Sequence, residues 1–485
     1  MTILAVLLIP LLASAVTAVI RGPRRMEFVY LLSAAGSFLA ALCLAAEVLR
    51  TGPVVWGDSF LYADHLSALV VLLTAFVYLV SAPYAVGYFR QDASRDKLRK
   101  YYVLTPLFGF FLFLVGLANN LGVMWVAVEG TALASIFLVT FYGRPTSLEA
   151  AWKYAILGGV GLSMALFGTV LTYYSAHQLL GGESLSALNW SVLVTRAPEF
   201  DKNVMRLAFV LVLLGYGTKA GLAPMHTWKP DAYSEAPVPV ATLMATAVLN
   251  CALYALARFY VLTARCLGPS FPSRLLVLFG LLTIGIAVPF ILVQRSYRRL
   301  LAYSSIDHGG IMVLGLGFGG ILGPLGMLLH MTFHSVTKPL LFFCAGNSQQ
   351  HTGNDSLRKG PGGLLHALPV SAPMFLVAAL AVTGTPPFSL FQSEFTILRA
   401  GFAAQRTASV ILFVAFAVAI FCGLFYHVAQ LVFGPPGDLP RGESSRWKTY
   451  PVIGLSLLVV VLGFWLPAPV YALVEGAARI LVVQP

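Results

Sequence analysis

Charged residues are scarce in this chain of 485 residues. Asp, Glu, Lys and Arg together make up 10% of it, whereas 58% of the residues are hydrophobic. The mean hydropathy is +0.83. A soluble domain of this size would need far more polar surface to cover itself. The composition therefore excludes a soluble globular protein and predicts a membrane protein.

Cysteine is also rare. The five cysteines stand singly, and no C-x-x-C motif is present. Iron–sulfur, zinc and disulfide frameworks therefore have no support in the sequence. The segment Gly315–Gly320 fits G-x-G-x-x-G, but it ends an apolar segment and lacks the βαβ unit that a dinucleotide site requires. We predict that this chain itself holds no cofactor and no metal.

Long apolar segments dominate what remains, and about fourteen of them could span a hydrocarbon core of about 30 Å as α-helices. No alternating pattern of a membrane barrel occurs, so helices are required to satisfy the backbone in lipid. We predict an all-α polytopic membrane protein. The segments lie near residues 2–20, 26–47, 64–86, 101–118, 120–141, 151–175, 204–223, 237–262, 272–293, 300–320, 322–346, 368–398, 405–432 and 451–480.

The basic residues, which give a net charge of +12, gather in alternate connections. With the N-terminus outside, the inner connections hold the clusters Arg21–Arg25, Arg95–Lys100 and Arg295–Arg299, and the outer ones hold few basic residues. This positive-inside bias places both termini on the outer side of the membrane. The first segment lacks a preceding basic region and a small-residue cleavage site, so we expect no cleaved signal peptide. The basic charge reflects topology, and we do not expect nucleic-acid binding.

Two of the apolar segments contain helix breakers beside an ionisable residue. Gly221 and Pro224 interrupt the seventh segment just after Lys219, and Gly384–Pro387 interrupts the twelfth, which carries Glu394. Discontinuous helices of this kind are typical of transporters and ion pathways. The pattern therefore favours ion movement across a membrane.

The interrupted segments belong to a longer repeat. Lys153 opens the sixth segment and Lys338 lies in the eleventh, so five segments separate each matching pair. An odd number of helices per unit turns the second unit upside down, which predicts two inverted five-helix repeats with broken helices 7 and 12. The predicted units are a three-helix flank (1–100), a first five-helix unit (101–262), a second, inverted unit (272–432), and a final connection and helix (433–485).

Lys219 and Glu129 are the most costly of the ionisable residues in the segments. A lysine at bilayer depth costs roughly 2.5–3.5 kcal/mol and is seldom present without a use. Desolvation favours the neutral forms of both side chains, and pairing favours their charged forms. A Lys219–Glu129 pair whose distance changes would act as a proton switch. The alternative is a static ion pair that joins two helices.

His330, His334 and Lys338 follow one another at intervals of four residues and share one helix face. Histidine titrates near neutral pH, which favours a hydrated proton relay. The basic neighbour argues against a metal site. Asp307 and His308, near the start of the tenth segment, could form the mouth of such a relay or merely cap a helix.

Other ionisable residues allow two interpretations. His226, Lys229, Asp231 and Glu235 follow the Pro224 break, where we expect them at the membrane surface as gating residues or as solvated scaffold. Glu394 is the candidate of the second unit, although Arg399 could simply pair with it. Lys153 could carry protons, or it could extend to the membrane surface.

Several motifs resemble those of the antiporter-like, proton-pumping subunits of respiratory complex I. The family also includes subunits of Mrp-type sodium/proton antiporters and of the membrane arms of group 4 [NiFe] hydrogenases. The resemblance covers about residues 60–432, and segments 119–125 and 388–395 look most similar to the hydrogenase-4 component F branch. The motifs are Leu148–Tyr154, Gly215–Trp228, Asp231–Pro237, Tyr303–His308, His334–Phe342 and Gly384–Phe388.

The resemblance implies a fourteen-helix core and a controlling Glu129–Lys219 pair with Lys153 alongside. It also implies that Lys338 and Glu394 continue a hydrophilic axis. The sequence departs from the pattern at Asn250, where many relatives carry lysine or histidine, because asparagine cannot carry a proton at neutral pH. Lys229 also departs from it, by standing where relatives usually carry an apolar residue. The proton-pathway candidates are Glu129, Lys153, Lys219, His226, Asn250, Asp307, His308, His330, His334, Lys338 and Glu394.

We therefore expect a multi-pass protein of a bacterial or archaeal cell membrane. It would translocate protons as a membrane-arm subunit of a hydrogenase-4 or complex I-like complex. Its partners would be other membrane-arm subunits and soluble [NiFe] hydrogenase-like and iron–sulfur subunits, where the redox chemistry takes place. Two alternatives remain: an Mrp-like cation/proton antiporter, and a non-pumping membrane anchor, for which Asn250 is the best support.

Overall fold

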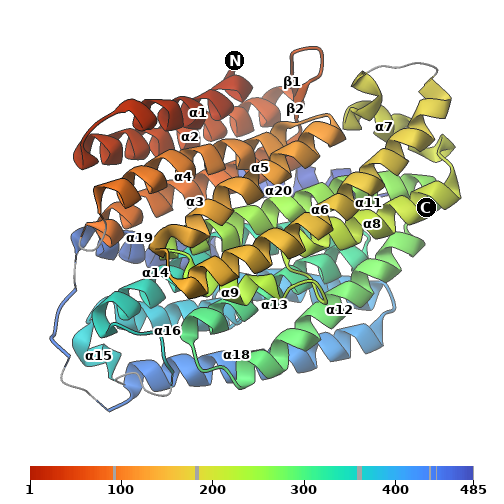
Figure 1. Cartoon of the computed structure of the whole chain (residues 1–485). Helices are drawn as coiled ribbons and strands as arrows, with labels where there is room; N and C mark the ends of the chain where they lie inside the picture. Colours follow the sequence, from red (N-terminus) through yellow and green to blue (C-terminus); the bar gives the residue numbers. More distant parts are fainter. Residues whose placement is uncertain (91–93, 181–184, 358–362, 436–438, 444, 484–485) are drawn as a thin grey trace.

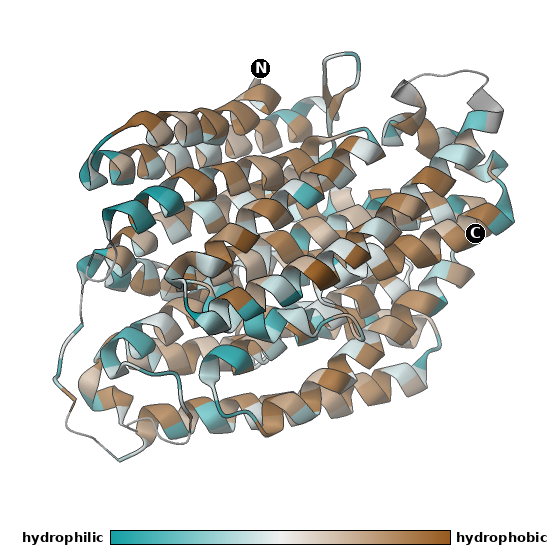
Figure 2. Ribbon diagram, in the orientation of Figure 1, coloured by the Kyte–Doolittle hydropathy of each residue, from teal (hydrophilic) through white to brown (hydrophobic). Residues whose placement is uncertain are grey.

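α-Helices lying side by side form almost the whole molecule (Figure 1). The computed structural model describes residues 1–90, 94–180, 185–357, 363–435, 439–443 and 445–483. Hydrophobic residues cover most of the helices, and hydrophilic ones gather toward helix ends and connections (Figure 2). This distribution is that of a helical bundle in lipid, and it agrees with the prediction of an all-α polytopic membrane protein.

The helices and strands follow the chain in this order. The first half comprises α1 (Thr2–Val19), α2 (Pro23–Thr51), β1 (Val54–Trp56), β2 (Leu61–Ala63), α3 (His65–Phe89), α4 (Arg95–Leu117), α5 (Leu121–Val139), η1 (Thr140–Tyr142), α6 (Pro145–Leu180), η2 (Leu185–Leu188), α7 (Trp190–Arg196), η3 (Ala197–Glu199), α8 (Lys202–Ala220), α9 (Trp228–Glu235) and α10 (Val238–Leu243). The remainder comprises η4 (Met244–Val248), α11 (Leu249–Leu267), α12 (Ser270–Leu292), α13 (Tyr297–Phe318), α14 (Leu322–Thr352), α15 (Leu364–Ala367), α16 (Ser371–Val382), α17 (Ser389–Ala403), α18 (Thr407–Phe433), α19 (Arg446–Phe464) and α20 (Ala468–Leu481).

Ten helices in the described part of the chain are long and apolar enough to cross a membrane. Among the predicted segments outside this group are the two that are interrupted, α8/α9 and α16/α17. α13 and α14, which carry the polar residues Asp307, His330 and Lys338, are outside it as well. The number fourteen and the inverted repeat stay predictions.

Both interruptions have the same backbone pattern. α8 ends at Gly221, which has φ +76°, and the chain reaches Pro224 three residues later. Just after α16, Gly384 has φ +66°, and Pro387 follows at the same spacing. A positive φ favours glycine, which has no Cβ to clash with the backbone. The second halves, α9 and α17, resume after each proline.

The predicted last segment, 451–480, is wrong in one respect. It contains two helices, α19 and α20, separated by Trp465–Pro467, because proline starts a helix well but cannot continue one. α20 packs along α3. The N-terminus lies near the β1–β2 hairpin, and the C-terminus lies apart from it at the right-hand edge of the view (Figure 1).

Three elements form the interior. The continuous helical stretch Val238–Leu267, which runs through α10, η4 and α11, is buried throughout its apolar window, and nearly all residues of α13 are buried. α14 is buried over most of its length as well. These helices expose little surface to lipid, so their polar side chains are surrounded by other parts of the protein. α8 joins them by packing closely on α6, where Gly215 leaves no room for a side chain against the Gly161 carbonyl.

Candidate buried ion pathway

Lys219 lies in the last turn of α8 and is 2% exposed. Its Nζ donates a 2.7 Å hydrogen bond to the Tyr154 hydroxyl of α6. Tyr154 in turn stacks on Trp228, with 4.4 Å between ring centroids, and the Trp228 indole donates to the Thr218 carbonyl. Lys219 is therefore held by a neutral partner that is itself fixed by both halves of the interrupted helix.

Glu129, on α5, is partly buried, and its Oε2 has no hydrogen-bond partner within the protein. Among the described residues, no ion pair joins it to Lys219 within 4.0 Å. The two side chains that the sequence predicts to pair are thus not in contact in this structure. A static ion pair, the alternative weighed from the sequence, is not present here.

Lys153 has a different environment from the buried lysines. Its side chain is 47% exposed and forms ion pairs with Glu149 at 2.7 Å and with Asp231 at 3.0 Å. Asp231 also binds Arg299 of α13, at 2.5 Å. This position agrees with a lysine that extends to the polar end of the bundle. Its proposed counterpart Lys338 is fully buried, so the two lysines do not have matching surroundings.

The second group of candidates lies between α13, α14 and α17. His308 Nδ1 and His330 Nε2 are 2.8 Å apart, and His330 Nδ1 lies 3.0 Å from the Ser393 hydroxyl. The His334 ring centroid is 4.9 Å from that of His308, and both of its nitrogens lack a protein partner. Lys338 Nζ donates to the Ser304 hydroxyl at 2.8 Å. His330, His334 and Lys338, which the sequence predicts on one helix face, thus belong to one buried cluster.

Asp307 and His308 do not cap a helix. They lie in the middle of α13, and the cap of that helix is Ser296, whose hydroxyl accepts from the Arg299 amide. Both residues are buried, and Asp307 Oδ1 has no partner. The capping alternative is therefore wrong.

The expectation of a surface position is also wrong for His226 and Lys229. His226 is 6% exposed and Lys229 is completely buried, with its Nζ donating a hydrogen bond to the Ala220 carbonyl at the end of α8. His226 Nδ1 lacks a partner. Asp231 and Glu235, farther along, are partly exposed, as expected for the membrane surface.

Glu394 lies on α17, and its carboxylate rests over the backbone of Gly384, where a Cβ would collide with it. Arg399 is exposed and forms no ion pair with it in the described structure. Ligand atoms of His308, His330 and Glu394 lie within 4.8 Å of one another. The 2.8 Å separation of the two imidazole nitrogens is that of a hydrogen bond, whereas two nitrogens on one tetrahedral zinc would be about 3.3 Å apart. The arrangement favours proton exchange over metal binding.

Asn250 lies in the first turn of α11, directly after the π-helical segment η4. Its Nδ2 donates to the Ser335 hydroxyl at 2.8 Å, and its Oδ1 has no partner. A π-helical segment inside a helix is often found at functional sites. The position is polar and buried, but it cannot titrate.

The neutral partners Tyr154, Ser304 and Ser393 are not among the predicted pathway residues, because hydroxyl groups in apolar segments give no distinctive signal. Arg258 of α11 is not among them either; its guanidinium forms two 2.7 Å hydrogen bonds with Asp64, the residue that caps α3. An arginine inside an apolar segment was a signal that could have found this pair.

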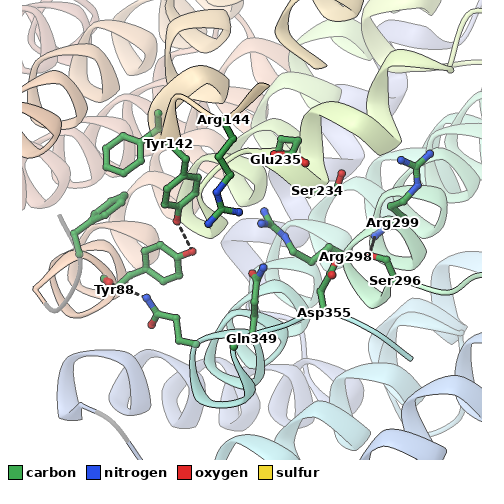
Figure 3. Close-up of a pocket in the computed structure, with 14 residues that line it drawn as sticks. Tyr88, Tyr142, Arg144, Ser234, Glu235, Ser296, Arg298, Arg299, Gln349 and Asp355 are labelled. Atoms are coloured by element: carbon green, nitrogen blue, oxygen red, sulfur yellow. Dashed lines mark hydrogen bonds between the residues drawn. The ribbon is translucent and has the colours of Figure 1, made fainter. Parts of the chain in front are cut away.

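A polar cavity of about 600 Å³ is lined in part by Arg299, the ion-pair partner of Asp231 (Figure 3). Arg144, Arg298, Arg299, Glu235 and Asp355 are among its lining residues. Arg298 is buried and donates hydrogen bonds to the carbonyls of Tyr233 and Ala236, so it holds the end of α9. The cavity brings polar surface to the end of the interrupted helix.

Residues 118–420 match the model of the NADH:quinone oxidoreductase/Mrp antiporter transmembrane family. The chain is 34% identical over 474 residues to a hydrogenase-4 component F homolog of Methylacidiphilum infernorum, covering 96% of this chain and 97% of the relative. It is 31% identical over 468 residues to NADH-quinone oxidoreductase subunit N of Desulforudis audaxviator, covering 90% of each. A subunit of the archaeal membrane-bound sulfane sulfur reductase has the same fold, with a TM-score of 0.88 over 99% of this chain and 97% of that subunit at 24% identity.

Proposed function

The chain belongs to the NADH:quinone oxidoreductase/Mrp antiporter transmembrane family, and from this premise we propose that it translocates protons as a membrane-arm subunit of a hydrogenase-4 or complex I-like complex. Its relatives are membrane subunits of such complexes and of antiporters. The proposal for this chain depends on what its own buried residues can do.

The observation that carries the proposal is a series of buried ionisable residues in the interior helices, with no carboxylate at contact distance from any of their lysines in the described structure. Several polar atoms along it lack a protein partner: Glu129 Oε2, His226 Nδ1, Asn250 Oδ1, Asp307 Oδ1, and His334 Nδ1 and Nε2. Leaving such an atom unsatisfied costs about 1–3 kcal/mol, and buried water normally supplies the missing bonds. A hydrated row of titratable groups is the structure that proton transfer requires.

The first half of the pathway would work through Lys219. Its ammonium is bound to the neutral Tyr154 hydroxyl, and it forms no ion pair within 4.0 Å in the described structure. A shift toward Glu129 would supply a carboxylate and favour proton uptake. Alternation between the two partners is a proton switch, and the neutral partner is the state described here.

The second half would work through Lys338, with Glu394 at the far end of the cluster. The imidazoles of His308 and His330 are hydrogen-bonded to each other, and each has a nitrogen within 4.8 Å of a Glu394 carboxylate oxygen. Imidazole can accept a proton at one nitrogen and release one from the other, so this pair suits transfer toward Glu394.

We assign electron transfer to partner subunits of the hydrogenase-like and iron–sulfur type, since the sequence has no C-x-x-C motif. Coupling would then be electrostatic, through the buried charges. A coupling of this kind requires two states of the pathway that the partner biases differently.

The test is redox-driven acidification of proteoliposomes by the complex purified with this chain, its partners identified by mass spectrometry. Lys219→Ala should abolish acidification while the complex stays assembled. Lys202→Ala is the matched control, because Lys202 is an exposed lysine at the other end of the same helix.

Normal acidification by assembled Lys219→Ala would overturn the proposal and favour a membrane anchor. Sodium-dependent proton movement without any redox partner would instead favour the antiporter.

A further inference from the structure

Lys229 is a buried lysine in an unusual position. It lies in the first turn of α9 and is 0% exposed. Its Nζ donates a 2.5 Å hydrogen bond to the carbonyl of Ala220, the last residue of α8, and lies 5.7 Å from the Tyr233 ring centroid. No ion pair within 4.0 Å reaches it in the described part of the chain. The amino group of Lys229 is therefore buried beside a carbonyl and an aromatic ring, and no carboxylate of the described structure pairs with it.

The interrupted helix is shaped around this side chain. A Cβ at Gly221 would collide with the Lys229 methylene groups and come within 2.9 Å of Nζ. The lysine therefore reaches back from the second half of the helix across the break onto the end of the first half. In the other unit, Glu394 occupies the corresponding place over Gly384.

Lys229 also stands between the two halves of the pathway. On one side, Ala220 directly follows Lys219. On the other, the Ala220 carbonyl faces α13 at Gly309, the neighbour of His308, at 3.8 Å from where a Cβ would stand. α9, which carries Lys229, packs on α13, the helix that carries His308.

The residue that could otherwise join the halves, Asn250, has no proton to exchange at neutral pH. Its amide is already bound to Ser335. A proton that passes between the halves therefore needs a different carrier near this point.

We propose that Lys229 is that carrier and links the Lys219 half of the pathway to the histidine cluster. This inference rests on the proposed function. In the transfer step, the Lys229 ammonium loses one proton to the neutral imidazole of His334, directly or through water. This leaves a neutral amine and an imidazolium. A proton that arrives from the Lys219 side restores the ammonium.

The environment suits an exchanging group. The Ala220 carbonyl and the negative end of the α8 dipole favour the ammonium, whereas burial without a carboxylate favours the neutral amine. A lysine that served only as a helix cap would need only the stabilisation of its ammonium by the carbonyl and the helix dipole.

The experiment compares Lys229→Met, Lys229→Arg and Lys229→Met combined with Asn250→His. Methionine keeps the apolar stem without charge, and arginine keeps the donor but cannot release its proton. If Lys229 carries protons, both single variants should lower redox-driven acidification of proteoliposomes by at least about tenfold in assembled complexes. The double variant, which places a titratable histidine at position 250, should recover part of the acidification rate.

A purely structural lysine gives a different pattern. Lys229→Arg would then acidify the vesicles at the wild-type rate, and this result overturns the inference, as does a normal rate in assembled Lys229→Met. If Lys229→Met does not assemble, the arginine variant decides alone. If Lys229→Met lowers the acidification rate and adding Asn250→His recovers none of it, the placement of Lys229 between the two halves of the pathway is also overturned. Failure of the wild-type complex to acidify vesicles would refute the proposed function instead, so the two failures are distinguishable.

Discussion

Two kinds of buried charge lie in this bundle, and their surroundings are opposite. Arg258 is bound by both oxygens of Asp64, receives further support from Ser67, and has its guanidinium 4.1 Å from the Trp190 ring centroid. Lys338 has a serine hydroxyl as its hydrogen-bond partner. Neither ring nitrogen of its neighbour His334 has a hydrogen-bond partner within the protein. The first charge is fully paired, and the second is not.

The difference separates structural from functional charge. A buried charge with a complete set of partners has no reason to change its protonation, and removing one partner strands the other. A buried charge with weak neutral partners can gain or lose a proton at lower cost. Substitutions at charges of each kind should therefore affect stability and proton translocation in opposite ways.

Asp64→Asn should have the largest effect on stability. It leaves Arg258 buried without a counter-charge, which costs about 3–5 kcal/mol. Thermal unfolding in detergent should show a lower midpoint, while translocation per assembled complex stays near the wild-type value. The double variant Asp64→Asn, Arg258→Met should recover part of the stability, and an unchanged midpoint in Asp64→Asn alone would contradict the assignment.

Lys338→Met should show the reverse pattern. Removing a buried, unpaired ammonium should leave thermal stability equal or higher, because no carboxylate is stranded. Translocation should fall by about 10²–10⁴-fold if Lys338 relays protons. Ser304→Ala serves as the control that removes only the hydrogen-bond partner, and a stability loss as large as that of Asp64→Asn would place Lys338 among the structural charges.

Gly221→Ala should destabilise the interrupted helix by about 1–3 kcal/mol from its left-handed backbone, with an added clash against Lys229. Gly143→Ala isolates the backbone cost, because Gly143 is left-handed as well, with φ +66° and ψ +21°, and no atom lies within 4 Å of a Cβ there. The difference between the two unfolding midpoints measures how tightly Lys229 fills the break. Equal midpoints would mean that Lys229 moves aside freely.

Glu475→Gln should have the smallest effect. Its pair with Arg479 on α20 is exposed and spans one helical turn, so it contributes about 0–0.5 kcal/mol. A midpoint within error of the wild type is expected at moderate salt. A larger loss would indicate that α20 depends on this pair for its position.

Much of the architecture was predictable from local patterns. The apolar segments, the breaks after Lys219 and at Gly384, and the burial of His330, His334 and Lys338 on one helix face all follow from hydropathy, helical periodicity and the properties of Gly and Pro. The errors concern places where neighbouring helices decide. Asp307 and His308 were placed near a helix start and lie in its middle, and Lys229 was placed at the surface and is buried.

The sequence by itself determined a helical membrane protein with two interrupted helices and ionisable residues inside them, because the partition of apolar residues into lipid is a local property of each segment. Only the tertiary structure decided which charges are paired. Lys219 meets Tyr154 across 65 residues and Arg258 meets Asp64 across 194, and no pattern within one segment specifies such partners. The physical reason is that a buried charge takes its state from whatever the packing of other helices brings within hydrogen-bonding distance.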